Sequence, residues 1–156
     1  MAALSDFAEN KIIDFLFRGQ ALGITGASAA AGTGPTNVYV ALYTANPTDS
    51  TAGTEVTGGS YARVTVASSL ANWAGTQGAG TTTASSGTTG TTSNNNAITF
   101  PAPTANWGVV TGAALCDATS GGNILAYGAL TVNKTVNNGD AAPSFPAGSL
   151  TFQLDN

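Results

Sequence analysis

Two acidic residues of the sequence stand close enough along the chain to be considered as a catalytic pair. Asp49 and Glu55 lie in one loop-forming stretch, and glycoside hydrolysis needs only two carboxylates about 5–10 Å apart. We prefer a structural interpretation, because Asp49 follows the turn signal Asn-Pro and nothing else nearby resembles a sugar cleft. Asp117 and Asp140 also adjoin turns, and the same interpretation applies to them.

The residues needed for most other kinds of catalytic or metal site are missing. The sequence has no histidine, which excludes a Ser-His-Asp catalytic triad or a Cys-His catalytic dyad. Cys116 is the only cysteine, which excludes an intramolecular disulfide and a cysteine-based zinc site; its apolar surroundings indicate a small core residue. No stretch has the spacing of a calcium loop. We therefore predict a protein that is not an enzyme, with no catalytic, cofactor-binding or metal-binding residues and no cofactor.

Charged residues are scarce, at 8% of the chain against about 25% in typical soluble domains. The four basic residues are scattered, so they cannot form the positive groove that binds phosphates, and we expect no nucleic-acid partner; they are Lys11, Arg18, Arg63 and Lys134. Arg63 could pair with Glu55 in a structural role. A surface with so few charges is typical of a protein that is covered in an assembly.

Neither a signal peptide nor a membrane span is visible in the sequence. Residues 1–6 lack the basic and apolar regions of a secretory signal, and no stretch approaches the roughly 18 apolar residues needed to cross a bilayer. We expect a protein that is made in the cytoplasm and has no membrane partner.

The first expected element is an amphipathic helix over residues 5–18. Acidic residues stand near its start, Arg18 near its end, and Gly19 directly after it, as the helix dipole and C-terminal capping favour. The helix either covers one end of its own β core or docks on another subunit, and we prefer the first interpretation. The apolar positions form a stripe at helical spacing: Leu4, Phe7, Ala8, Ile12, Phe15 and Leu16, widened by Ile13 and Phe17.

Two segments have a composition that does not favour a core element. Residues 19–37 are mostly small and polar, which predicts a flexible arm. Residues 75–96 hold no charge and no large apolar side chain, so they cannot offset the roughly 1–2 kcal/mol per residue that ordering costs. We expect a low-complexity loop there, and we expect both segments to contact neighbouring subunits.

The rest of the chain predicts a mainly β fold. Residues 38–44 alternate between two apolar faces, as in a strand that is buried on both sides, and Gly-rich turns join later strand pairs into hairpins. We expect an antiparallel β-sandwich or jelly-roll-like domain over residues 38–156, preceded by the N-terminal helix (1–18) and the arm (19–37). The other expected strands are residues 61–66, 97–101, 107–116, 124–130 and 150–155.

Several short motifs, taken together, are similar to a known family. Glu-Val-x-Gly-Gly-x-Tyr-Ala-Arg at 55–63 and Asn-Trp-Gly-x-Val-Thr at 106–111 are the most specific, with supporting stretches at 4–7, 38–48 and 121–130. The chain resembles the small bacteriophage virion proteins that are commonly named phage tail fibre proteins. The resemblance implies a virion location and a structural role.

Within the virion, two places are open on the basis of the sequence. We favour a capsid decoration (cement) protein that stabilises the head, because long fibres usually show repeats or heptads and none is visible. The alternative is a structural or host-adhesion component of a tail fibre or baseplate. A glycan-binding module would need exposed aromatic residues, whereas we expect Trp107 to pack in the core. The expected partners are copies of the chain itself, with a trimer expected by analogy, and the major capsid protein or tail proteins.

Overall fold

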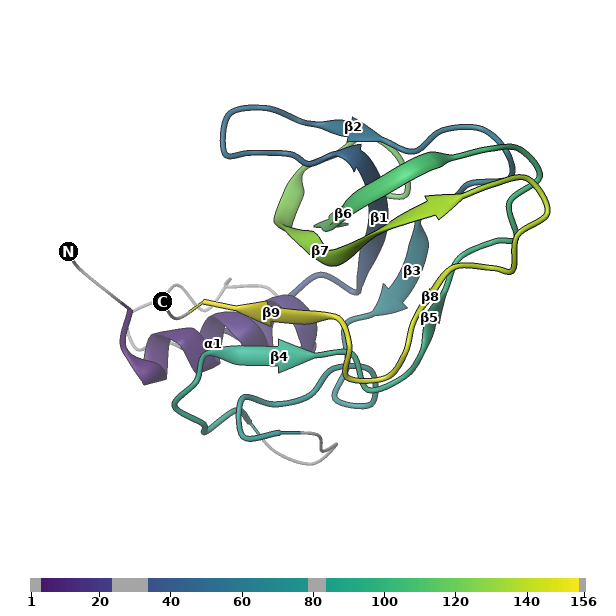
Figure 1. Cartoon of the computed structure of the whole chain (residues 1–156). Coiled ribbons are helices and arrows are strands. Elements are labelled where there is room, and N and C mark those ends of the chain that lie inside the picture. Colours follow the sequence, from purple (N-terminus) through teal and green to yellow (C-terminus); the bar gives the residue numbers. More distant parts are fainter. Residues whose placement is uncertain (1–3, 24–33, 79–83, 155–156) are drawn as a thin grey trace. The chain divides into compact units, whose positions relative to one another are not determined.

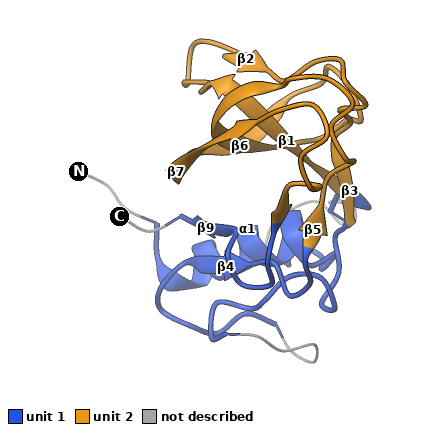
Figure 2. Ribbon diagram, turned by 45° about the vertical axis from the view of Figure 1, so that its right-hand side comes forward, with its two compact units in different colours: residues 1–37, 67–97, 145–156 blue, residues 38–66, 98–144 orange. Residues whose placement is uncertain are grey.

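A computed structural model of the chain describes residues 4–23, 34–78 and 84–154. The fold is mainly β with antiparallel sheets and one helix near the N-terminus, which confirms the predicted class (Figure 1). The chain divides into two compact units (Figure 2): unit 1 comprises Met1–Asn37, Ala67–Ala97 and Phe145–Asn156, and unit 2 comprises Val38–Val66 and Ile98–Ser144. These boundaries differ from the predicted domains, because the N-terminal helix and the segment 75–96 belong to the same unit.

Unit 2 is built on a five-stranded antiparallel sheet in the order β2-β1-β6-β7, with β3 also paired to β1. The register between β1 and β6 sets Val40 opposite Leu115, and the register between β6 and β7 sets Ala114 opposite Tyr127. A short turn over residues 117–123 joins β6 to β7, whereas β1 and β6 pair although they are distant in the sequence. The strands are β1 (Asn37–Ala45), β2 (Thr54–Glu55), β3 (Val64–Ala67), β6 (Gly108–Cys116) and β7 (Ile124–Val136).

The strand β1 is buried on both faces, as its sequence predicted. Val40 and Leu42 point to one face and Ala41 and Tyr43 to the other, and all four are almost inaccessible to solvent. Ala41 and Tyr43 pack with Ala114 and Cys116 of β6 in one buried cluster. The prediction that Cys116 is a core residue is therefore confirmed.

Four shorter strands form two small antiparallel sheets. β4 (Thr91–Ser93) pairs with β9 (Thr151–Gln153), and β5 (Ile98–Thr99) pairs with β8 (Ser144–Phe145). The predicted strands at 97–101 and 150–155 are present but shorter. The predicted strand at 124–130 continues to Val136.

The helix α1 (Asp6–Phe17) of unit 1 is present at the predicted position. The Ser5 hydroxyl caps its start by accepting a hydrogen bond from the Ala8 amide, and Gly19 follows its end with a φ of +67°. Among the residues that the structure describes, no helix is long and apolar enough to cross a membrane.

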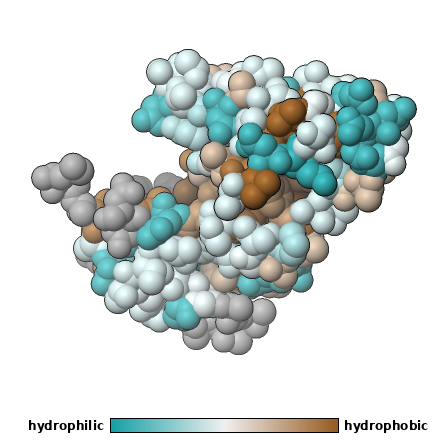
Figure 3. Space-filling model, viewed as in Figure 1, coloured by the Kyte–Doolittle hydropathy of each residue, from teal (hydrophilic) through white to brown (hydrophobic). Residues whose placement is uncertain are grey.

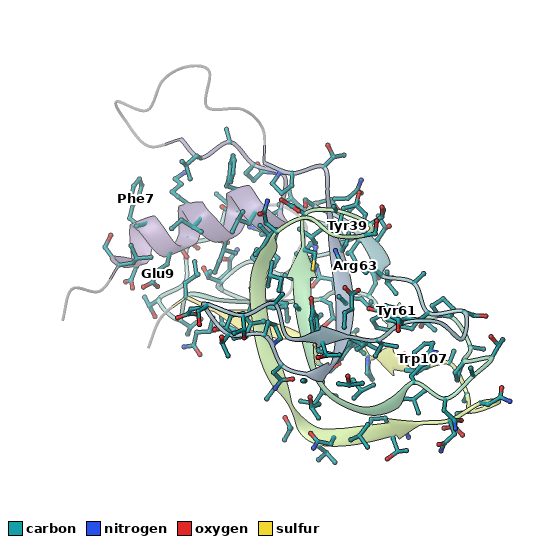
Figure 4. All side chains as sticks on the ribbon, turned by 90° about the horizontal axis from the view of Figure 1, so that it is seen from above. Phe7, Glu9, Tyr39, Tyr61, Arg63 and Trp107 are labelled. Carbon is teal, nitrogen blue, oxygen red and sulfur yellow. The ribbon has the colours of Figure 1, made fainter. Side chains whose placement is uncertain are left out.

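The side of α1 that is buried differs from the predicted one. Leu4 and Phe7 of the apolar stripe are 49% and 57% exposed, and Figure 4 shows Phe7 and Glu9 on different sides of the helix. The reason is that the buried side is largely polar and is held by hydrogen bonds, which hydrophobic periodicity does not detect. The buried side consists of Glu9, Asn10, Ile13, Asp14 and Phe17.

The segment 75–96, predicted to be a low-complexity loop outside the core, supplies the partners of this polar side. Asp14 forms an ion pair of 2.7 Å with Arg18 and accepts hydrogen bonds of 2.8 and 2.6 Å from the amide and hydroxyl of Ser85. Thr76 donates its hydroxyl hydrogen to the Asn10 side-chain oxygen. In the described part of this segment, hydrogen bonds to α1 replace the missing apolar burial. The expectation that the segment contacts neighbouring subunits stays a prediction.

Residues 24–33 of the predicted arm lie outside the described residues. Directly after them, Thr36 accepts a hydrogen bond from the Ser68 amide within unit 1. The expectation of a flexible arm stays a prediction.

Candidate interaction surfaces

The most specific sequence motif, at residues 55–63, folds into a connected cluster inside unit 2, which we call the Glu55 cluster (Glu55, Tyr61 and Arg63). Both Glu55 carboxylate oxygens accept hydrogen bonds from the Arg63 guanidinium, at 2.8 and 2.7 Å. The Tyr61 hydroxyl donates to Glu55 and accepts from the Leu42 amide of β1, both at 2.9 Å. Figure 4 shows Tyr61 and Arg63 beside the strands of this unit. The predicted pairing of Arg63 with Glu55 is confirmed.

The Glu55 cluster also fixes a turn that is distant in sequence. The remaining Arg63 amino group donates hydrogen bonds of 2.7 and 2.9 Å to the carbonyl oxygens of Ala118 and Gly121. These residues belong to the turn between β6 and β7, which is closed on its other side by the Asp117 carboxylate and the amide of Asn123. A single arginine therefore holds the β6–β7 hairpin in place from the motif at 55–63.

Gly59 of the same motif allows a close approach of Trp107. The Trp107 indole donates a hydrogen bond of 2.9 Å to the Gly59 carbonyl, and a Cβ on Gly59 would lie 3.0 Å from the indole nitrogen. Gly58 and Gly59 both have positive φ, at +70° and +54°, which side chains disfavour. The Tyr61 ring packs edge-on against the indole with the ring centroids 5.4 Å apart. The prediction that Trp107 packs in the core is confirmed, since it is 5% exposed.

Burial and charge together shift the pKa values of this region. Burial alone would raise the pKa of Glu55, but the hydrogen bonds from Arg63 and Tyr61 outweigh it and lower that pKa. Burial raises the pKa of Tyr43 to about 12, with a further contribution from Cys116. Burial also raises the pKa of the Cys116 thiol, so this thiol stays protonated and poorly nucleophilic at neutral pH.

The candidate carboxylates at 49 and 55 are held by different partners. Asp49 accepts a hydrogen bond of 2.5 Å from the Tyr127 hydroxyl, whereas Glu55 belongs to the Glu55 cluster. Asp117 accepts from the backbone and side-chain amides of Asn123 across its turn, and Asp140 accepts from the Asn137 amide. The turn interpretation of Asp117 and Asp140 is therefore confirmed.

Metal ligands do not gather anywhere in the described part of the chain: no three histidine, cysteine, aspartate or glutamate side chains come close enough to hold an ion. Both tryptophans of the chain are buried, with Trp73 fully inaccessible and packed edge-on against Phe17 in unit 1. Tyr127 is an exposed aromatic residue that does lie beside a carboxylate, that of Asp49. Sequence reasoning missed this pair because 78 residues separate Tyr127 from Asp49.

The surfaces that remain as candidates for contact with other molecules carry exposed apolar side chains. In unit 2 they lie on the β6–β7 hairpin, where Figure 3 shows strongly hydrophobic atoms among hydrophilic ones. In unit 1 they lie on α1 and after β9. The residues are Val109, Leu125, Tyr127 and Val132 on the hairpin, Leu4 and Phe7 at α1, and Leu154 after β9.

Comparison with protein families identifies one to which the chain is similar. The model of a family described as Podophage GP4 fiber I protein gp80 matches residues 3–153. No curated protein matches the sequence. The family match spans both units and nearly all of the described residues.

Proposed function

The chain belongs to the podophage GP4 fiber I protein family, and from this membership we propose that it is a non-catalytic subunit of a phage fibre that assembles with further copies of itself. The family is one of virion structural proteins. Its description favours the fibre over the capsid decoration role that we preferred from the sequence.

The observation that carries the assembly part of the proposal is the edge of the sheet formed by β7. This strand has 13 residues and pairs on one side with β6, and within the described residues it is the last strand of the sheet. An edge strand presents unpaired amide and carbonyl groups that can bind another strand. Monomeric proteins protect such edges with prolines, several charges or short strands. In β7 the only charged residue is Lys134, and proline is absent.

A bulge in β7 places an exposed apolar side chain at this edge. Val110 of β6 lies opposite Lys134, but Gly112 lies opposite Ala129. The four residues 130–133 of β7 therefore face Thr111 alone, and they include Val132, which is 78% exposed. A bulge breaks the ladder locally and turns side chains outward. An exposed valine on an otherwise nearly uncharged edge is suited to burial against another protein.

We propose that a second copy of the chain binds to this surface. Each copy brings the same free edge and the same valine, so contacts between copies cover the feature in every subunit. The low charge of the chain, with four basic and eight acidic residues, keeps repulsion between copies small. The trimer expected from the sequence stays part of the proposal.

Sedimentation of the purified chain at micromolar concentration tests the assembly. We expect a concentration-dependent oligomer in the parent and a shift towards monomer in Val132→Lys, because burying an unpaired ammonium at the contact is unfavourable. Leu154→Lys is the matched control, since it also places a lysine at an exposed apolar position but in unit 1, and it should leave the oligomer intact. A parent protein that is monomeric at all concentrations, or a Val132→Lys variant that assembles like the parent, contradicts the proposal.

A further inference from the structure

We propose that Tyr127 and Asp49 form a surface site in unit 2 for neutral saccharides. Tyr127 is 41% exposed, and its hydroxyl donates to Asp49 at 2.5 Å. Both residues lie in unit 2. The site goes beyond the assembly role, because binding by the isolated chain does not depend on contacts between copies.

The ring is presented in a way that leaves it accessible. Tyr127 lies directly opposite Ala114 in the β6–β7 ladder, and opposite residues of an antiparallel pair point to the same face. The small side chain of Ala114 is therefore the cross-strand neighbour of the ring. The bond to Asp49 fixes the hydroxyl end, so little side-chain entropy remains to be lost on binding.

The loop that carries Asp49 is itself held rigidly. Thr48 and Thr51 exchange two backbone hydrogen bonds of 2.9 and 3.3 Å around it, and their hydroxyl oxygens lie 2.8 Å apart. Gly53 closes the loop with a φ of +68°, where a Cβ would lie 2.5 Å from the Ala45 carbonyl oxygen. The carboxylate is thus positioned before any ligand arrives.

The chemistry of the site selects an uncharged, hydroxyl-rich ligand. An aromatic face packs against the C–H side of a sugar ring, while a carboxylate accepts strong hydrogen bonds from sugar hydroxyls. The exposed hydroxyls of Thr48, Ser50 and Thr51 surround Asp49 and can donate or accept further bonds. An anionic ligand would be repelled by Asp49, and a purely apolar one would remove water from the carboxylate without offering it hydrogen bonds.

A shallow site of this kind binds weakly in one copy. Several copies held together raise the apparent affinity without any new contact. A fibre that presents many copies is therefore suited to a saccharide surface.

Saturation-transfer NMR with the intact chain tests the site, using glucose, galactose, rhamnose, N-acetylglucosamine and, as the anionic probe, glucuronate. We expect signals from at least one neutral sugar, a loss of about tenfold or more in affinity in Tyr127→Ala and in Asp49→Ala, and a smaller loss in Tyr127→Phe, which keeps the ring. Leu125→Ala is the control, because Leu125 is also exposed and lies in the same strand. It should bind like the parent.

The proposal is overturned if none of the neutral sugars gives a signal, if Tyr127→Ala binds as well as the parent, or if glucuronate binds better than the neutral sugars. Circular dichroism of each variant separates lost binding from lost folding, and Tyr127→Phe provides a second test should Tyr127→Ala unfold. Sugar binding by a chain that remains monomeric would contradict the assembly proposal alone. Assembly without sugar binding would contradict the saccharide site alone.

Discussion

At the scale of single residues, the motif at 55–63 serves the fold. Glu55 accepts hydrogen bonds from the Tyr61 hydroxyl and the Arg63 guanidinium. Arg63 in turn donates hydrogen bonds to the turn between β6 and β7. The sequence predicted the pair of Glu55 and Arg63 because the two residues are near in the chain and opposite in charge. It could not predict the contacts to Ala118 and Gly121, which are backbone carbonyls 55 and 58 residues away from Arg63.

Replacement of Glu55 by glutamine should destabilise the protein by about 2 kcal/mol at pH 7, because the buried Arg63 guanidinium loses charged acceptors. The pKa of Glu55 is lowered in the folded state from 4.5. Its contribution to stability is therefore complete above that value and is lost as the pH falls through the lower folded-state pKa. Urea unfolding as a function of pH measures this, and the difference between parent and variant should shrink in acid.

The exposed Asp6 provides a control for Glu55→Gln. Asp6→Asn removes one carboxylate at the start of α1 and should cost less than about 1 kcal/mol. A difference between Glu55→Gln and the parent that is constant from neutral to acidic pH would contradict the account of the Glu55 cluster.

At the scale of elements, strands with apolar alternation were predicted and polar packing was not. β1 and the β6–β7 hairpin carry enough apolar residues for the pattern to be visible. β4 consists of Thr91, Thr92 and Ser93, and the buried side of α1 is largely polar. These parts are stabilised by hydrogen bonds between segments distant in sequence, for which a single sequence contains no periodic signal.

Asn94 shows how the segment 75–96 supports unit 1. Its side-chain amide donates to the carbonyls of Asn96 and Pro146, and its side-chain oxygen accepts from the Leu150 amide, all at 2.8 Å. Asn94→Ala should lower the free energy of unfolding by about 3 kcal/mol, because buried backbone groups lose their partners. Urea unfolding followed by circular dichroism measures the loss.

Asn96→Ala is the matched control for Asn94→Ala. Asn96 also donates side-chain hydrogen bonds, but it is exposed, so water can replace them. The change should cost less than about 1 kcal/mol. Equal stability of Asn94→Ala and the parent would contradict this account and would indicate that Asn94 contributes nothing to the fold.

At the scale of the whole molecule, the small number of charged residues predicted a surface that is covered in an assembly. The family match indicates that this assembly is a virion. The mainly β class followed from strand patterns alone. The division into two units did not, because each unit combines segments from separate parts of the chain. Composition cannot indicate which of these segments meet.

The number of copies in each virion distinguishes the fibre from the decoration role. We expect few copies, because fibres occupy the tail, whereas a decoration protein covers the whole head shell. Quantitative gel densitometry of purified particles against the major capsid protein measures this ratio. A copy number comparable to that of the capsid protein would contradict the fibre assignment and restore capsid decoration.

The burial of Cys116 allows the local opening of unit 2 to be measured through the reactivity of this thiol. The chain has a single thiol, and it is completely shielded between β1 and its neighbours. A thiol reagent can reach it only when this part of the sheet opens. The labelling rate therefore reports the free energy of that opening, in the isolated chain and in the intact particle alike, without an engineered residue.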